Sequence, residues 1–291
     1  WRGAMVYIND LEGKITKINL TNSDEFNEEL FDQTTLFNLR GNTTNARYSY
    51  FAMDAGVGVD SGQLMLFGST GNFSDLGSRE DNMDNILYGV IDPHYPFFKH
   101  LNDVDIPLGA KEGFVQLAHK GAEAASSIDD EDVCKNVTGE IDEEVCIGTK
   151  KAWVIKMGQD ENNNFYDPKT YRKASASPTL FKGKVYYPIY QPPPGSNKCS
   201  QGSAFICVSD DECGTNNSAK LKLETPVDVN NPGLNACAYV RKGVLSELVI
   251  FADKLFANVA GPTGDEDTLF SILSVPGEIM QNKGGWRDSS F

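Results

Sequence analysis

The stretch from residue 63 to residue 93 constrains the fold most, because it combines two strand patterns with a long polar connection. The first run, Leu64-Met65-Leu66-Phe67, ends at Gly68-Ser69-Thr70-Gly71, and residues 86–92 form a second run rich in β-branched and aromatic side chains. Such runs, bounded by Gly, Asn, Asp and Ser, are typical of strands. The connection carries Asp75, Glu80, Asp81 and Asp84. The stretch therefore predicts two strands joined by an acidic loop too long for a tight hairpin, and it contains no catalytic motif.

Short strand patterns recur along the rest of the chain. Residues 5–8 and 14–20 alternate around a turn that ends at Gly13, and residues 176–190 predict a hairpin about Lys182-Gly183. The polar residues 21–48 are expected to cross to the next unit, with one short helix at about residues 25–31. Further strands are predicted at residues 114–119, 152–157, 204–208, 236–240, 245–252, 255–259 and 268–275.

Helical periodicity is nearly absent, which predicts an all-β protein. Strand pairs at intervals of roughly 40–50 residues favour a β-propeller over a sandwich or a barrel, which stay as alternatives. We expect residues 1–291 to form a single β-propeller-like domain, partial or compact, with acidic loop insertions. The start at Trp1 also indicates a fragment or processed product of a longer chain.

The charge of the chain limits its partners. Its 41 acidic and 26 basic residues give a net charge of -15, which repels nucleic acid, so we expect no nucleic-acid partner. No stretch approaches the roughly 20 apolar residues of a membrane helix, so we expect no membrane-spanning segment.

The six cysteines have long spacings and lie far from the three histidines, which favours disulfides over a zinc site. Disulfides imply an oxidising compartment. Six cysteines allow 15 connectivities, and we predict only the pair Cys134–Cys146, which would close a short acidic loop.

The sequence offers little support for catalysis. It lacks a G-x-S-x-G nucleophile elbow and a phosphate-binding loop, so we expect no enzymatic activity. Calcium is the one ion for which donors are suitably spaced, at Asp160, Asn162, Asn164 and Asp167, although the Gly and Glu of an EF-hand are missing. The alternative is a solvated Asn-rich turn. Asp75, Glu80, Asp81 and Asp84 form a weaker candidate.

Three segments, in order, share motifs with one protein family. Val6-Tyr7-Ile8-Asn9-Asp10-Leu11-Glu12-Gly13 begins a strand pair, Leu66-Phe67-Gly68-Ser69-Thr70-Gly71 is followed by Leu87-Tyr88-Gly89-Val90-Ile91-Asp92, and Ser177-Pro178 precedes a Gly turn and Val185-Tyr186-Tyr187. With these motifs and Gly285-Trp286-Arg287-Asp288 near its end, the chain resembles the C-terminal β-propeller domain of the PilY/PilC family. These are secreted proteins linked to the tips of bacterial type IV pili.

The resemblance implies that the chain is the C-terminal part of a longer protein. It also implies a non-catalytic extracellular domain, at the cell surface or pilus tip, that acts in cell adhesion and pilus biogenesis. Its partners would be pilus subunits or minor pilins and a host or abiotic surface ligand. The acidic loops at residues 73–85, 122–148 and 159–167 would form the contact surface. A quinoprotein-like propeller dehydrogenase and a structural subunit of an extracellular assembly are the alternatives.

Overall fold

The structure is a computed structural model of the 291-residue chain. It describes residues 5–21, 30–39, 47–59, 61–80, 83–98, 152–157, 170–195, 200–212, 214, 237–251 and 254–261. It also gives the backbone course of residues 126–127, 133–135, 222–223 and 269–273. The described residues form strands and one short 3-10 helix, so the prediction of an all-β protein is confirmed.

The strands form four sheets, numbered here in chain order. Sheet 1 contains β1 (Met5–Asn9), β2 (Lys14–Asn19), β3 (Gln33–Asn38) and β7 (Ser126–Ser127). Sheet 2 has the order β4 (Asp54–Val57), β5 (Leu64–Ser69), β6 (Ile86–Asp92), β9 (Ala152–Lys156) and β8 (Val133–Lys135).

The second half of the chain forms the other two sheets. Sheet 3 contains β10 (Lys173–Ala174), β12 (Lys184–Gln191), β13 (Ser203–Asp210) and β15 (Cys237–Lys242), with β11 (Thr179–Phe181) beside β12. Sheet 4 contains β14 (Lys222–Leu223), β19 (Leu269–Leu273), β18 (Lys254–Ala260) and β16 (Val244–Leu245), with β17 (Val249–Phe251) beside β18.

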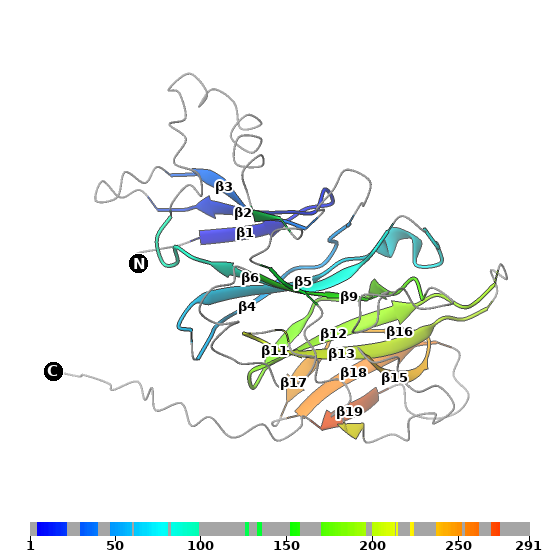
Figure 1. Cartoon of the computed structure of the whole chain (residues 1–291). Coiled ribbons are helices and arrows are strands. Elements are labelled where there is room, and N and C mark those ends of the chain that lie inside the picture. The colour runs from blue at the N-terminus through cyan, green and yellow to red at the C-terminus, as the bar shows by residue number, and fades with distance from the viewer. Residues whose placement is uncertain are drawn as a thin grey trace.

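The four sheets are stacked in chain order, from the blue sheet 1 to the orange sheet 4 (Figure 1). Most neighbouring strands are antiparallel, while β7 and β8 join the sheet edges in parallel. Sequential sheets that pack face on face are the repeating units of a propeller.

Three apolar layers hold the stack together, and the alternation of side chains along each strand builds them. Ile15, Leu66, Tyr88 and Val154 belong to the layer between sheets 1 and 2. The next residues along the same strands of sheet 2, such as Phe67 and Trp153, face Tyr187 and Phe205 of sheet 3. Tyr186 and Ile206, on the opposite face of sheet 3, pack against Leu255 and Val259 of sheet 4.

Two glycines explain the family-like motifs in β5 and β6. Gly68 lies directly opposite Tyr88, and Gly89 lies directly opposite Trp153. A Cβ atom at Gly68 would stand 2.1 Å from the Tyr88 hydroxyl oxygen, and one at Gly89 would stand 2.4 Å from the Trp153 ring. Each glycine therefore leaves the space that a large aromatic side chain on the next strand fills.

A buried ion pair joins sheets 1 and 2. The Lys17 ammonium lies 2.6 Å from the Asp92 carboxylate, and both side chains are 1% exposed. Tyr7 donates a hydrogen bond to the same carboxylate at 2.6 Å, and Lys17 donates another to the Phe97 carbonyl at 2.7 Å. Burial and the neighbouring Asp92 raise the pKa of Tyr7 above its ordinary value. These bonds compensate the cost of removing two charges from water.

Several expected elements agree with the structure. The strand at residues 86–92 coincides with β6. The predicted hairpin is β11–β12, with Lys182 and Gly183 at φ 52° and 69°, which is the left-handed geometry of a tight hairpin turn. The strand expected at residues 245–252 is instead split between β16 and β17.

Other expectations need correction. Residues 21–48 were expected only to cross between units, but β3 lies within them and is buried, because threonine suits a pleated sheet despite its polarity. Residues 54–57, for which no strand was predicted, form β4. Of the expected helix at residues 25–31, only residues 30 and 31 are described, and they form a turn. The strand expected at residues 114–119 lies outside the described residues.

Candidate contact surface

The acidic loop between β5 and β6 is the predicted contact loop that the structure describes most fully. Its described residues are 70–80 and 83–85, and they include the 3-10 helix η2 (Phe73–Asp75). Phe73 and Asp75 are exposed, whereas Thr70, Gly71, Met83 and Asn85 are buried. The loop thus has an exposed tip and a buried base.

Lys173 of sheet 3 holds the exposed part of this loop in place. Its ammonium donates hydrogen bonds to the carbonyl oxygens of Asp75 and Ser78, both at 2.7 Å, and to the Ser78 hydroxyl at 2.6 Å. Burial lowers the pKa of Lys173, while the nearby carboxylates of Asp75 and Glu80 oppose that shift. A buried cation therefore binds the backbone of a negatively charged loop.

Thr70 and Asn85, at the two ends of the loop, close its base. The backbone nitrogen of Ile86 donates to the Thr70 hydroxyl oxygen at 2.9 Å. The backbone nitrogen of Thr70 donates to the Ile86 carbonyl oxygen, also at 2.9 Å. The Thr70 hydroxyl also donates to the Asn85 side-chain oxygen at 3.3 Å. Asn85 in turn donates from its side-chain nitrogen to the Arg172 carbonyl at 2.8 Å. The base is thereby attached to sheet 3 as well as to sheet 2.

The same base receives the ends of a second predicted contact loop, residues 159–167. That loop lies outside the described residues, but Met157 before it donates from its backbone nitrogen to the Asn85 carbonyl at 3.0 Å. Thr170 after it donates to the Met157 carbonyl at 3.5 Å. The structure therefore brings the bases of two predicted contact loops together at one end of the strands of sheet 2.

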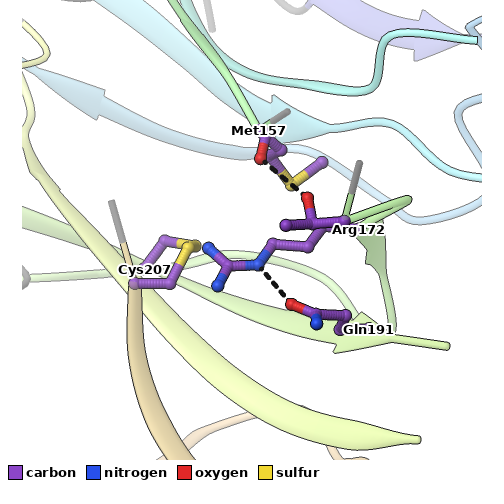
Figure 2. Close-up of a disulfide and its surroundings, with 6 residues drawn as sticks. Met157, Arg172, Gln191 and Cys207 are labelled. Carbon is purple, nitrogen blue, oxygen red and sulfur yellow. Dashed lines mark hydrogen bonds between the residues drawn. A yellow bond between two sulfur atoms is a disulfide. The ribbon is translucent and has the colours of Figure 1, made fainter. Parts of the chain in front are cut away.

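Buried arginines extend this polar layer beneath the loops. Arg47 is 4% exposed and donates to the carbonyls of Asp84 and Leu39 at 2.7 and 2.6 Å. Arg172 is 2% exposed, and its Nε donates to the Gln191 side-chain oxygen at 2.9 Å. Figure 2 shows its guanidinium between Gln191 and Cys207, and its central carbon lies 4.3 Å from the centre of the Phe205 ring. We call Arg47, Thr70, Asn85, Arg172 and Lys173 the polar base.

Aromatic side chains surround the loop tip. Phe51 packs edge to face on Phe73 with 4.9 Å between ring centres, and the Tyr50 hydroxyl donates to the Ser74 hydroxyl at 3.1 Å. Arg79 lies 5.7 Å from the centre of the Tyr171 ring. Tyr50 and Phe73 are each 39% exposed. The tip therefore presents aromatic surface, amide and hydroxyl groups and carboxylates side by side, a composition that suits binding.

Sequence reasoning placed this loop between two strands but missed the side chains that hold it. Thr70 and Asn85 could have been found, because a hydroxyl and an amide at the two ends of a loop are natural partners for free backbone groups. Lys173 and Arg172 carry no local signal, since their partners lie in other sheets.

The third predicted contact loop, residues 122–148, needs correction in part. Two described pieces of it are strands, β7 in sheet 1 and β8 in sheet 2. Open sheet edges offer unpaired backbone groups, and these pieces pair with them. The range is thus partly an extension of the sheets.

The predicted calcium ligands Asp160, Asn162, Asn164 and Asp167 lie outside the described residues. Across the part of the chain that is described, no three His, Cys, Asp or Glu side chains gather in a way that could hold a metal ion. That finding includes Asp75, Glu80 and Asp84, the described members of the weaker candidate. Their loop turns backbone carbonyls toward the Lys173 ammonium instead.

Among the described residues, a disulfide joins Cys207 of β13 and Cys237 of β15, which stand opposite each other in sheet 3. It belongs to the apolar layer between sheets 2 and 3. The predicted pair Cys134–Cys146 falls outside the described side chains. A disulfide is consistent with the oxidising compartment that the cysteine pattern predicts.

No helix in the described ranges has the length and apolar character needed to cross a bilayer.

Comparisons with known proteins give the fold. No protein-family model matches the chain, and no curated protein matches it. Among solved structures, the crystal structure of the Pseudomonas aeruginosa PilY1 C-terminal domain is similar, with a TM-score of 0.52 and 11% sequence identity. The match covers 91% of this chain and 56% of that chain, so this chain spans about half the length of that domain. The likeness confirms the all-β, propeller-like fold.

Proposed function

We propose that this chain is a non-catalytic extracellular domain of a type IV pilus-associated protein, which acts in surface attachment and pilus biogenesis. The observation that supports this most is the fold shared with the PilY1 C-terminal domain over 91% of the chain. The motifs that suggested the family lie in β1, β5, β6 and β12 of this chain.

The loop tip supplies the contact in this proposal. A stack of sheets gives a rigid support, and the polar base fixes the loop on it from sheets 2 and 3. Aromatic and carboxylate groups at the tip can bind a host or abiotic surface ligand, with pilus subunits or minor pilins as the partners in assembly. The function needs no reacting group, cofactor or metal.

The test is a strain that lacks residues 1–291 of this protein, studied by electron microscopy of pili and by an attachment assay. Fewer pili would support the role in biogenesis, and normal pili with failed attachment would support the role in adhesion. Unchanged pili together with unchanged attachment would contradict the proposal. Production of the protein from a plasmid provides the control.

A further inference from the structure

A buried amine and a buried carboxyl group lie within reacting distance of each other between sheets 1 and 2. Lys17 belongs to β2 of sheet 1, and Asp92 is the last residue of β6 in sheet 2. The Lys17 nitrogen lies 2.6 Å from Oδ2 of Asp92. A nitrogen at that distance is about 3 to 3.5 Å from the carboxyl carbon, which is the separation expected between atoms that react.

Hydrogen-bond donors other than Lys17 hold both oxygens of the Asp92 carboxyl group. The Tyr7 hydroxyl donates to Oδ2 at 2.6 Å, and the backbone nitrogen of His94 donates to Oδ1 at 3.0 Å. A donor on Oδ1 stabilises the negative charge that this oxygen gains when a nucleophile adds to the carboxyl carbon. A hydroxyl on Oδ2 supplies the proton with which that oxygen can leave. The site thus contains a nucleophile, an acid and a donor for the developing oxyanion.

The surroundings of this pair exclude water and are partly aromatic. The side chains of Lys17 and Asp92 are each 1% exposed. The Lys17 nitrogen lies 6.0 Å from the centre of the Tyr7 ring and 5.9 Å from the centre of the Phe98 ring. Moving two charges out of water is costly, whereas an amide carries no charge. The burial of the pair therefore favours the neutral product of its reaction.

An exposed ion pair of the same chain shows what distinguishes this site. Lys14 lies 2.8 Å from the Glu12 carboxylate, but these side chains are 21% and 65% exposed. Water solvates both of those charges, so that pair has no comparable tendency to become an amide. The two pairs have similar separations and differ chiefly in burial.

We propose that Lys17 and Asp92 form an intramolecular amide bond, with Tyr7 as the proton donor. The ammonium first transfers one proton to Oδ2, which gives a neutral amine and a neutral acid. The amine nitrogen then bonds to the carboxyl carbon, and the bond from that carbon to Oδ2 breaks. Tyr7 gives its proton to Oδ2 and recovers one from the nitrogen, so Oδ2 leaves as water and Oδ1 becomes the amide oxygen. The step consumes no further reactant.

The bond attaches sheet 1 to sheet 2 by a link that neither urea nor a reducing agent breaks. It joins β2 to the end of β6, beside the apolar layer that these sheets already share. The proposal does not depend on the role in attachment.

The mass of the natively purified 291-residue chain, reduced, denatured and measured by mass spectrometry, tests the proposal. The expected mass is lower than that of the sequence by one water molecule, and reduction removes the contribution of disulfides. Lys17→Arg keeps the positive charge, but its guanidinium is a poor nucleophile, so this variant should have the full mass of its sequence. A wild-type chain of full mass, or an equal loss of mass in Lys17→Arg, would overturn the proposal.

A tryptic digest of the wild-type chain locates the bond without relying on a variant. Trypsin does not cleave after a lysine whose side chain is an amide, so residues 15–40 should stay joined, through Lys17, to residues 80–99. Cleavage after Lys14 in the same digest is the internal control, because Lys14 belongs to the exposed pair. Separate peptides of residues 15–17, 18–40 and 80–99 would contradict the proposal.

Tyr7→Phe tests the proton donor and leaves both reacting groups in place. In timed samples from cell-free synthesis, the amide should form at least about tenfold more slowly than in the wild-type chain, because the general acid is lost. Tyr50→Phe removes a hydroxyl from the loop tip and should leave the rate unchanged. An equal rate in Tyr7→Phe and the wild-type chain would overturn the assignment of Tyr7.

Discussion

Two buried regions of the molecule are built differently: the apolar layer between sheets 2 and 3, and the polar base beneath the loops. The layer consists of apolar side chains such as Phe67, Trp153 and Tyr187, with a disulfide in it. The polar base consists of three cations, an amide and a hydroxyl, and most of its donors bind backbone carbonyls. Apolar packing is insensitive to direction, whereas hydrogen bonds fix a backbone at defined points. We infer that the layer stabilises the scaffold and the polar base shapes the loop.

Replacing Trp153 by alanine should have the largest effect. Trp153 is 2% exposed, packs on Phe67 and Tyr187, and donates its ring N–H to the Asp211 carbonyl at 2.8 Å. Its loss leaves a cavity and should lower the free energy of unfolding by about 3–5 kcal/mol. Urea unfolding measures this, with Tyr95→Ala, at a position that is 44% exposed, as the control. An equal loss in both variants would contradict the account of the layer.

Removing the disulfide should have the next largest effect. Cys207 and Cys237 are 30 residues apart in sequence. A cross-link of that span restricts the unfolded chain and so adds about 3 to 4 kcal/mol to the free energy of unfolding. The double variant Cys207→Ala/Cys237→Ala should unfold at correspondingly lower urea concentration. A reducing agent should destabilise the wild-type chain by breaking this bond. The double variant lacks the bond and should not show that loss of stability. No difference between wild type and variant would show that the bond is not formed.

Replacing Lys173 by methionine should act on the loop more than on the scaffold. The change removes the cation that holds the carbonyls of Asp75 and Ser78, which should cost about 1–3 kcal/mol, mostly as opening of the loop. Hydrogen exchange should quicken in the described loop residues 70–80 and change little in β12 and β13. Lys242→Met, on the same sheet, is the control. Faster exchange throughout sheet 3 would contradict the separation of the two regions.

The layers should also set the response to alkaline pH. Burial raises the pKa of Tyr88 to about 12, against an ordinary value of 10.0. Because the folded pKa is the higher one, the stabilisation is complete below pH 10 and is lost as the pH rises from about 10 through about 12. The loss should be about 1 kcal/mol at pH 11 for this group. Absorbance at 295 nm during titration should show a late-ionising class of tyrosines that Tyr88→Phe reduces.

Runs of β-branched and aromatic side chains predicted strands correctly where the sheets bury those runs. Residues 86–92 read as a strand in sequence and form β6 over the same bounds. β3 escaped prediction because Gln33, Thr34 and Thr35 resemble a loop by polarity, and only tertiary packing shows that they are buried. The same holds for Lys17 and Arg172, whose charges are compensated by groups distant in sequence.

The disulfide illustrates the limit of spacing arguments. Cys207 and Cys237 lie in β13 and β15, and the chain between them passes through sheet 4 as β14. Their pairing follows from two strands becoming neighbours in sheet 3, which the number of intervening residues does not reveal. A stronger signal was available, since both cysteines stand in strand-like runs, where cross-strand partners face each other.

The central claim is that the loop tip makes the contact and the sheets support it. Its most direct test is attachment to polystyrene, with a pilus count, by cells that produce Asp75→Asn/Glu80→Gln. Cells that produce Glu12→Gln/Glu247→Gln are the comparison, because these two residues lie in other loops and their substitution removes the same amount of charge. The account predicts altered attachment only for the first pair, with normal pili in both. Equal attachment by both variants and the wild type would contradict it.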